Sequence, residues 1–303
     1  MRFSIIVIHR NGLNRLRSTL DSIISATSLI DEIILVDNAS TDNSIQEISK
    51  IYEGINIIKN TVNLGYGRAA NQAINSGKGK YFLICNNDIF VPSNILNNFE
   101  ELFINEPRAG IISGQQTNLK GEITRTSSRK HSYLSELDGI GRLDHAKDPQ
   151  KISEVSTLRG ACLAVRKKMI GKIGAFDTDF FFYYEDTEWC IRAKNHRWKV
   201  LLNPSIRFIH IGGASSDEFF KESRIEFYRS RIIFWGKVFP RLIVIILHLW
   251  NIPKLLLDLI FYSIAVSVTF GQNKRLRRKM QDRVSVFLWL CLGKPNSWGL
   301  PKK

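Results

Sequence analysis

The first hundred residues alternate short apolar runs with segments whose apolar residues recur every three or four positions. Four apolar runs have the length of buried β-strands: residues 3–8, 32–36, 55–59 and 80–85. The segments that follow them have helical spacing: residues 13–25, 45–52, 64–76 and 93–105. Strands that alternate with helices predict a mostly parallel sheet covered on both faces.

Polar clusters follow three of these strands, at residues 9–11, 37–42 and 86–88. In an open α/β sheet, ligands bind outside the carboxyl ends of the strands. We therefore expect the three clusters to meet at one edge and to form a binding site. Ordinary turn chemistry remains an alternative, because Asn, Asp and Ser favour turns in any protein.

The middle of the chain is less regular. Residues 116–157 are polar with little periodicity, which indicates a loop bordering a site. Further on, the patterns predict strands at 158–165, 199–202 and 206–209, and a helix at 185–196 that follows the aromatic run 180–184.

The last eighty residues differ in character. A helix is predicted at 224–239, and two apolar runs, 242–252 and 255–270, are separated by Pro253-Lys254. Neither run reaches the ~20 apolar residues that a membrane-spanning helix needs. A basic cluster at 274–279 follows. Residues 224–303 contain fifteen Lys or Arg and three Asp or Glu, so this part of the chain carries +12 of the total net charge of +15.

Apolar surface beside a polybasic segment is typical of attachment to an anionic membrane surface. The apolar runs would form a re-entrant hairpin or helices lying in the interface, and a buried helical subdomain or an oligomer contact remains open. Too many apolar residues separate the charges for a nucleic-acid surface, so we expect no nucleic-acid partner.

Composition sets the remaining limits. The chain has 303 residues, 44% hydrophobic and 23% charged, which suits a folded protein with a sizeable core. Its four cysteines form no CxxC pair, which indicates neither a disulfide framework nor a zinc site and favours a reducing cytosol. The apolar run at the N-terminus is too short for a signal peptide, so we expect no export.

Two of the strand-end carboxylates suggest specific chemistry. Asp37 can accept hydrogen bonds from a pyrimidine N–H or a ribose hydroxyl, although a carboxylate at a helix entry is also a cap. Asp88 can bind Mg²⁺ or Mn²⁺, with Asn86 turned the same way two residues earlier. Since only one carboxylate is present, a bound diphosphate would have to supply further oxygen ligands.

Four ordered motifs carry a family resemblance: Ser4 to Val7, Val36 to Asp42, Asn63 to Asn71, and Cys85 to Asp88. Over roughly residues 1–240 the chain resembles glycosyltransferase family 2, with its GT-A fold, an α/β nucleotide-binding mixed sheet flanked by helices. Within that family it resembles the rhamnosyltransferase-like enzymes of bacterial surface polysaccharide synthesis. The resemblance implies a nucleotide-sugar-binding half at 1–115 and an acceptor-binding, catalytic half at 116–223. The charge and the apolar runs of residues 224–303 add a basic, helical, membrane-associating region.

The resemblance also implies roles for individual residues. Asp88, in a metal motif that is usually richer in Asp, would bind Mn²⁺ or Mg²⁺ with His210. The nucleotide-sugar donor would be bound by residues that follow strands or lie on the segment 63–71: His9, Asn11, Asp37, Asn63, Gly65, Arg68, Asn71, Asn86 and Asn87.

The segment from Tyr183 to Arg192 resembles the Glu-Asp motif of the family. There Asp186 would be the general base, Glu185 would help to hold the acceptor, and Gly160, Ala161 and Trp189 would border it. Position at a helix start would keep both carboxylates ionised, while aromatic surroundings would raise their basicity. An acidic helix cap is the alternative interpretation.

These observations predict an inverting glycosyltransferase that uses a nucleotide-diphosphate sugar donor and a saccharide acceptor, expected to be lipid-linked. It would lie at the cytoplasmic face of the membrane, peripheral or monotopic, with an oligomer contact open to the C-terminal region. A nucleotidyltransferase is an alternative, but residues 9–15 are a poor version of the triphosphate-binding loop it needs. The second alternative is a non-catalytic protein that binds nucleic acid through its basic tail.

Overall fold

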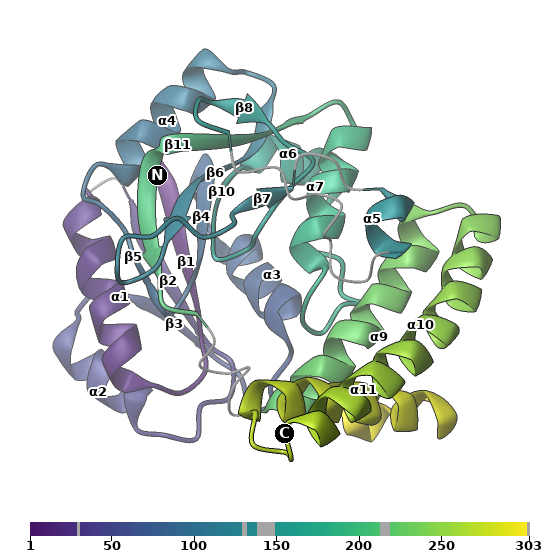
Figure 1. Ribbon diagram of the computed structural model, residues 1–303. Helices are drawn as coiled ribbons and strands as arrows, with labels where there is room; N and C mark the ends of the chain where they lie inside the picture. The colour runs from purple at the N-terminus through teal and green to yellow at the C-terminus, as the bar shows by residue number, and fades with distance from the viewer. Residues whose placement is uncertain (29–30, 129–131, 138–148, 213–218, 302–303) are drawn as a thin grey trace.

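The alternation of the first hundred residues is present as parallel strands joined by helices (Figure 1). The computed structural model describes residues 1–28, 31–128, 132–137, 149–212 and 219–301. The elements of the first part are β1 (Phe3–His9), α1 (Leu13–Ala26), β2 (Glu32–Asp37), α2 (Ser44–Ile51), β3 (Asn56–Lys59), α3 (Tyr66–Ser76) and β4 (Tyr81–Asn86). β3, β2, β1 and β4 lie side by side and run parallel.

The rest of the sheet makes it mixed. Its strands are β5 (Ile89–Phe90), β6 (Ala109–Thr117), β8 (Ser153–Glu154), β10 (Cys162–Arg166) and β11 (Lys199–His210), in the order β3-β2-β1-β4-β10-β6-β11-β5 with β8 beside β11. β10 runs antiparallel to both β4 and β6. The expectation of a mostly parallel sheet therefore holds for the first half, while the whole sheet is mixed, as the GT-A resemblance implies.

The predicted and observed strands differ in three places. β6 was not predicted, because its sequence contains two glycines and four polar residues although every position is buried. The run 158–165 is divided between β9 (Thr157–Leu158), which pairs with β7 (Ser127–Ser128), and β10. The runs 199–202 and 206–209 are one strand, β11, with an irregularity between Asn203 and Arg207.

Helices cover both faces of the sheet. α1, α2 and α4 (Ile95–Asn105) pack on the face that carries Ile5 and Val7. α3, α6 (Lys167–Ile173) and α7 (Glu185–Asn195) pack on the opposite face with Ile6 and Ile8. Successive strand residues point to opposite faces, so a strand buried on both sides is apolar throughout, as β1 is.

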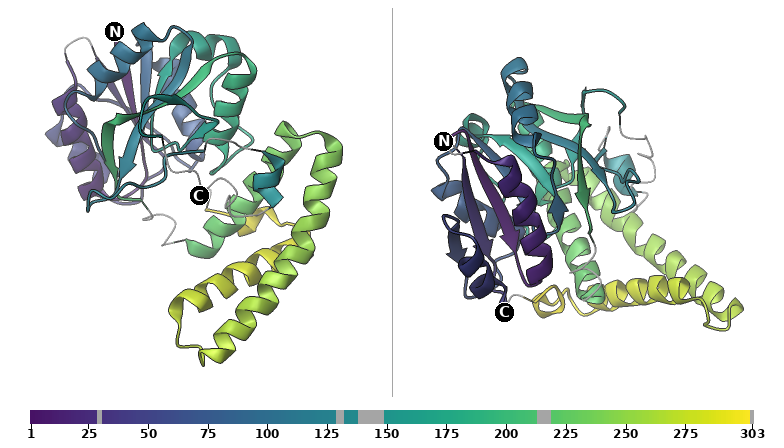
Figure 2. Two further views of the ribbon diagram at one scale, coloured as in Figure 1. Left: turned by 45° about the horizontal axis from the view of Figure 1, so that its top comes forward. Right: turned by 90° about the vertical axis from the view of Figure 1, so that its left-hand side faces the viewer.

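The C-terminal region consists of helices: α9 (Phe220–Val238), α10 (Arg241–Val268), α11 (Lys274–Cys291) and the short 3₁₀ helix η2 (Asn296–Trp298). α10 and α11 form an arm that extends away from the sheet (Figure 2). A five-residue helix from the middle of the chain, α5 (Tyr133–Leu137), lies against α9 and α10 (Figure 1).

Pro253 does not divide the apolar segment. α10 continues through it as one helix of 28 residues, roughly 42 Å long at 1.5 Å per residue. The expected pair of short apolar helices is therefore wrong. Proline removes one backbone donor and its ring crowds the preceding turn, but packing of α10 against α11 around Leu255 supports the helix just beyond it. By length and composition, α10 is the one helix in the described chain that could cross a membrane, and most of its apolar side chains are exposed.

Candidate functional site

The ends of β1 and β4 are joined by a buried histidine. Asn87 Nδ2 lies 2.7 Å from His9 Nδ1, and His9 Nε2 lies 2.8 Å from Ser44 Oγ. An amide nitrogen can only donate, so Nδ1 accepts and Nε2–H donates to the serine. Burial lowers the pKa of His9 to about 4, so the ring is neutral at neutral pH. Asn11 is part of the same hydrogen-bonded group, because its backbone oxygen accepts from Asn87 Nδ2 at 3.3 Å.

The end of β2 is organised by an asparagine that the sequence analysis did not single out. Asn38 is 5% exposed and donates from Nδ2 to Asn63 Oδ1 at 2.8 Å and to the Gly65 carbonyl at 3.2 Å. Its Oδ1 accepts from the Leu64 N–H at 2.9 Å. Its neighbour Asp37 instead accepts from a backbone N–H within its own turn. The clue to Asn38 was its place in a polar cluster directly after a buried strand.

Only a residue without a side chain fits at position 65. Gly65 has φ +82°, and a Cβ there would collide with the backbone oxygen of Phe181. That oxygen accepts from the Tyr66 N–H at 2.9 Å. This close approach fixes the aromatic segment 180–184 beside the start of α3.

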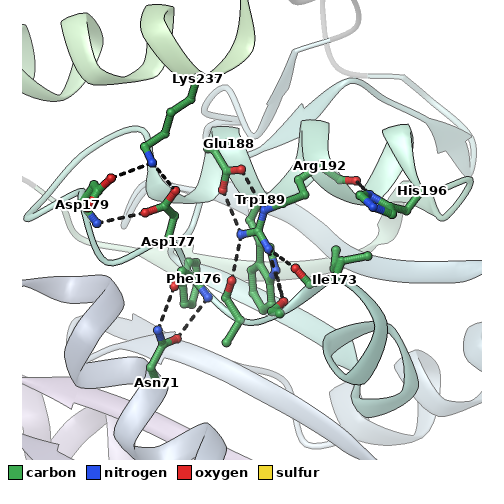
Figure 3. A network of polar contacts seen from close by, with 12 residues as sticks. Asn71, Ile173, Phe176, Asp177, Asp179, Glu188, Trp189, Arg192, His196 and Lys237 are labelled. Carbon is green, nitrogen blue, oxygen red and sulfur yellow. Dashed lines mark hydrogen bonds and ion pairs between the residues drawn. The ribbon is translucent and has the colours of Figure 1, made fainter.

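Arg68 and Asn71 lie on α3 but not on the wall of the cavity. Asn71 donates to the backbone oxygen of Phe176 at 2.8 Å and accepts from its N–H at 3.0 Å (Figure 3). Arg68 donates to the Thr178 carbonyl at 2.9 Å. Their side chains therefore hold the segment that leads into α7.

Trp189 has a similar structural position. It is fully buried, donates from Nε1 to the Gly174 carbonyl at 3.0 Å and packs against Phe176. On the next turn of α7, Arg192 forms an ion pair with Glu188 at 2.8 Å and binds backbone carbonyls of the 173–175 turn (Figure 3). In this structure the indole cannot touch an acceptor in the cavity.

Asp88 and His210 form the candidate metal pair. His210 Nε2 lies 3.1 Å from Asp88 Oδ1, which is buried and accepts no hydrogen bond from a described residue. The other carboxylate oxygen accepts from the Gly212 N–H at 3.0 Å. Asn86 Nδ2 lies 3.3 Å from the same imidazole nitrogen.

This donor set suits a cation in part. Mn²⁺ and Mg²⁺ both accept a carboxylate oxygen and an imidazole nitrogen as ligands. A cation between the two side chains would satisfy Asp88 Oδ1, which has no hydrogen-bond partner among the described residues. Within the described residues, no cluster of three or more His, Cys, Asp or Glu surrounds the pair. Other ligands would have to come from a substrate or water.

Glu185 and Asp186 begin α7, after Tyr183 and Tyr184, which both have positive φ (70° and 67°). Non-glycine residues pay a conformational cost there, and such strain gathers at functional sites. Burial, and then the neighbouring Asp186 charge, raises the pKa of Glu185 to about 8. Its Oε2 is buried and has no hydrogen-bond partner among the described residues. Burial therefore outweighs the helix dipole, and the expectation that both carboxylates stay ionised is wrong for Glu185.

Asp186 has more partners. Its Oδ2 accepts from the Gly160 N–H at 2.7 Å, and its Oδ1 accepts from the N–H and hydroxyl of Thr187 at 2.6 and 3.1 Å. Burial raises the pKa of Asp186 as well, while these hydrogen bonds oppose the rise. A poorly solvated carboxylate with a raised pKa is suited to accept a proton from a substrate.

Gly160 and Ala161 connect this pair to the metal side. The Ala161 carbonyl accepts from the Asn86 N–H at 3.0 Å, and the Gly160 carbonyl accepts from the Tyr66 hydroxyl at 3.0 Å. A Cβ on Gly160 would lie 3.2 Å from Asp186 Oδ2, tighter than most contacts of that kind.

One cavity of about 1290 Å³ unites the two sides. Twelve predicted site residues line it: His9, Asn11, Asn63, Gly65, Asn86, Asn87, Asp88, Gly160, Ala161, Glu185, Asp186 and His210. Four predicted residues do not: Asp37, Arg68, Asn71 and Trp189. Further lining residues come from α9 and α11, which sequence patterns alone did not connect with the site.

Two glycosyltransferases are similar to this chain in sequence. N-acetylglucosaminyl-diphospho-decaprenol L-rhamnosyltransferase of Mycobacterium tuberculosis is 24% identical over 214 residues, 63% of this chain and 70% of that protein. Poly(ribitol-phosphate) beta-glucosyltransferase of Bacillus spizizenii is 30% identical over 166 residues, 52% of this chain and 26% of that protein.

Solved structures share the GT-A fold. Mannosyltransferase PcManGT from Pyrobaculum calidifontis, in complex with GDP-Man and Mn²⁺, aligns with a TM-score of 0.59 at 15% identity over 97% of this chain and 88% of that chain. TarS of S. aureus aligns with a TM-score of 0.51 at 17% identity over 75% of this chain, which spans 39% of that protein. The family model described as glycosyl transferase family 2 matches residues 4–174. The chain therefore belongs to glycosyl transferase family 2 and is a glycosyltransferase.

Proposed function

We propose that the protein transfers a sugar, with inversion, from a nucleotide-diphosphate donor to a hydroxyl of a saccharide acceptor. The observation that carries this proposal is the shared cavity, with the Asp88–His210 pair on its donor side and the Glu185–Asp186 pair on its acceptor side. A single displacement needs a base for the incoming hydroxyl and a stabilised leaving group opposite to it.

Asp186 is the base in this mechanism. Its carboxylate takes the acceptor proton as the acceptor oxygen bonds to the anomeric carbon, and the electrons of the breaking bond leave with the nucleotide diphosphate. Gly160 and Thr187 orient the carboxylate through their hydrogen bonds. Glu185, neutral at neutral pH, has an unpartnered oxygen that can hydrogen-bond to the acceptor.

On the donor side, Asn38 and Asn63 border the pocket proposed for the nucleoside, with His9, Asn11 and Asn87 as its polar floor. Asp88 and His210 would hold Mn²⁺ or Mg²⁺. A bound divalent ion neutralises charge on the departing diphosphate. Arg68 and Asn71 contribute indirectly, by holding the segment before α7.

The acceptor is proposed to be lipid-linked, and the sugar to be rhamnose or a related hexose, in bacterial cell-surface polysaccharide synthesis. Support comes from the mycobacterial relative and from the exposed apolar face of α10 beside the basic start of α11. These features favour attachment at the cytoplasmic face of the membrane. Residues 1–115, 116–223 and 224–303 would then serve the donor, the acceptor and the membrane.

Thermal unfolding tests the donor site. The detergent-purified protein would be heated with UDP, dTDP, GDP or CMP, with and without Mn²⁺. We expect one nucleotide diphosphate to raise the melting temperature in a metal-dependent way, because a ligand that binds only the folded state stabilises it. Asp88→Ala should abolish the shift, whereas Asp186→Asn should keep it and lose sugar transfer.

Three results would contradict the proposal. A flat response to every nucleotide would remove the donor site, and release of inorganic pyrophosphate from a nucleoside triphosphate would favour a nucleotidyltransferase. Transfer at an undiminished rate by Asp186→Asn would remove the base.

A further inference from the structure

The cavity does not end at α7 but continues between α9, α10 and α11. These helices add five cationic side chains and one carboxylate to its wall: Arg224, Arg231, Arg275, Lys279, Arg283 and Asp282. We refer to this part of the cavity as the cationic branch. Three of the five cations are paired with carboxylates, which leaves an excess of two positive charges. A cleft with an excess of one sign of charge attracts ligands of the opposite sign.

Contacts connect the branch with the acceptor side. Tyr183, two residues before Glu185, packs edge-on against Phe227 of α9 with ring centroids 5.7 Å apart. The Arg224 guanidinium lies 5.8 Å from the centre of the same ring and forms an ion pair with Asp282 of α11 at 3.2 Å. The branch therefore starts beside the candidate base.

Some of its charges already have partners. Arg231 is buried and bound to Glu136 at 2.8 Å, and Arg283 is bound to Asp258 at 2.9 Å. Arg275 and Lys279 have no carboxylate within 4 Å in the described parts of the chain; Lys279 Nζ lies only over the Tyr262 ring, 5.5 Å from its centre. These two cations remain available for a ligand.

An orphaned acceptor lies among them. Asp282 is 3% exposed, and its Oδ1 has no hydrogen-bond partner among the described residues, although Oδ2 binds Arg224. A buried unpaired oxygen is costly unless a ligand supplies a donor. Lys279 and Arg275 lie about one and two turns before Asp282 on α11. Two available cations and one unpaired acceptor on the same helix match a phosphate-bearing molecule that also has a hydroxyl group.

The donor diphosphate is a poor candidate for the branch. The cations that act on Asp88 are His210 and Arg15, and none comes from α9 or α11. An apolar surface also begins next to the branch. Tyr262 lines it from α10, while the adjacent Phe261 is 63% exposed on the outer face of that helix.

We propose that the cationic branch binds the diphosphate of a polyprenyl-diphosphate-linked saccharide, with Arg275 and Lys279 on the phosphates and Asp282 on a sugar hydroxyl. The polyprenyl chain then runs along the apolar face of α10, and the saccharide points toward Asp186. This assignment rests on the proposed function, because it identifies the acceptor of the same site.

Binding of farnesyl diphosphate in detergent tests the assignment. The variant Arg275→Ala/Lys279→Ala removes the two available cations. The matched control Lys274→Ala/Arg277→Ala removes two cations from the same helix that do not line the cavity. We expect the first variant to bind the probe at least about tenfold more weakly, the loss typical of charge-assisted contacts, and the control to bind within about twofold of wild type.

Two further ligands distinguish the source of any effect. Farnesol, which lacks phosphate, should bind wild type and both variants alike, and the nucleotide that shifts the melting temperature with Mn²⁺ should bind all three alike. Equal weakening in both variants, or no saturable binding of farnesyl diphosphate to wild type, would overturn the assignment. A loss of nucleotide affinity in Arg275→Ala/Lys279→Ala would assign the branch to the donor instead. Since the nucleotide response is measured separately, failure of the branch and failure of the donor site are distinguishable.

Discussion

Replacement of Glu185 by Gln should stabilise the fold, and the gain should grow with pH. Gln has nearly the same shape and cannot ionise. In the native protein the Glu185 carboxyl is 6% exposed, one of its oxygens has no partner, and the Asp186 charge lies next to it. Ionisation in that place is unfavourable because neither water nor a cation compensates for the charge.

The magnitude follows from proton linkage. Burial raises the pKa of Glu185 from 4.5 in the unfolded chain to about 8 in the fold. Between these values the native state binds one more proton than the unfolded state, so the free energy of unfolding of wild type falls by about 1.4 kcal/mol per pH unit. Glu185→Gln lacks this loss. Its advantage should be near zero at pH 4.5 and reach at most on the order of 5 kcal/mol at pH 8.

Urea unfolding of both proteins, from pH 5 to 8.5, measures the difference directly. Subtraction cancels the titrating groups that do not interact with Glu185, including His9, whose lowered pKa gives the opposite trend below pH 6.5. The neighbouring Asp186 interacts with Glu185, so its titration contributes to the measured difference. Glu101→Gln, on an exposed position of α4, is the control and should show no growing advantage. A difference between Glu185→Gln and wild type that stays constant across this range would contradict the raised pKa, because it would mean that Glu185 is already ionised in the fold.

Three other substitutions probe the supports of the site. Gly65→Ala should lower stability by more than about 1 kcal/mol and weaken nucleotide binding, because its Cβ would meet the Phe181 carbonyl at positive φ; unchanged melting and affinity would contradict this. Glu136→Ala should cost about 3–5 kcal/mol in urea unfolding, since it leaves the Arg231 charge buried and unpaired, and a cost below 1 kcal/mol would mean that the guanidinium finds water. Asn71→Ala should cost about 1–3 kcal/mol through two lost backbone hydrogen bonds while nucleotide affinity stays within twofold, and a large affinity loss with unchanged stability would place it in the donor pocket.

The polar residues proposed to bind the donor could be predicted from the sequence because their position depends on local rules. A buried strand that ends in polar residues places them at the carboxyl edge of the sheet whatever the rest of the chain does. His9, Asn87 and Asp88 therefore lie on one cavity wall, as the pattern indicated. β6 was not predicted because Gly110 and Gly114 interrupt the apolar pattern of its sequence. They are there because a side chain would collide with Met169 or with the backbone of Ile206.

The other differences between prediction and structure concern the direction of side chains and the positions of helices that are distant in sequence. Trp189 and Asn71 belong to motifs near the site, but helical spacing turns them toward the segment 174–178 rather than into the cavity. Pro253 predicts a break only if the isolated helix is considered, and packing against α11 overrides that preference. The cationic branch needs α11 beside Tyr183 and Phe227, a proximity that no local pattern contains.

The antiparallel direction of β10 explains how the two halves of the site stay in register. β10 pairs with β4 so that Cys162 lies opposite Cys85, and the residues just before β10 therefore lie beside the polar end of β4. A parallel strand in that place would bring its own carboxyl end there. The antiparallel direction instead delivers Gly160 and Ala161, whose backbone binds Asn86 on one side and Asp186 on the other. The proposed donor and acceptor groups are thus joined by two consecutive residues directly before a strand of the sheet, and a displacement reaction needs such support to align its reacting groups.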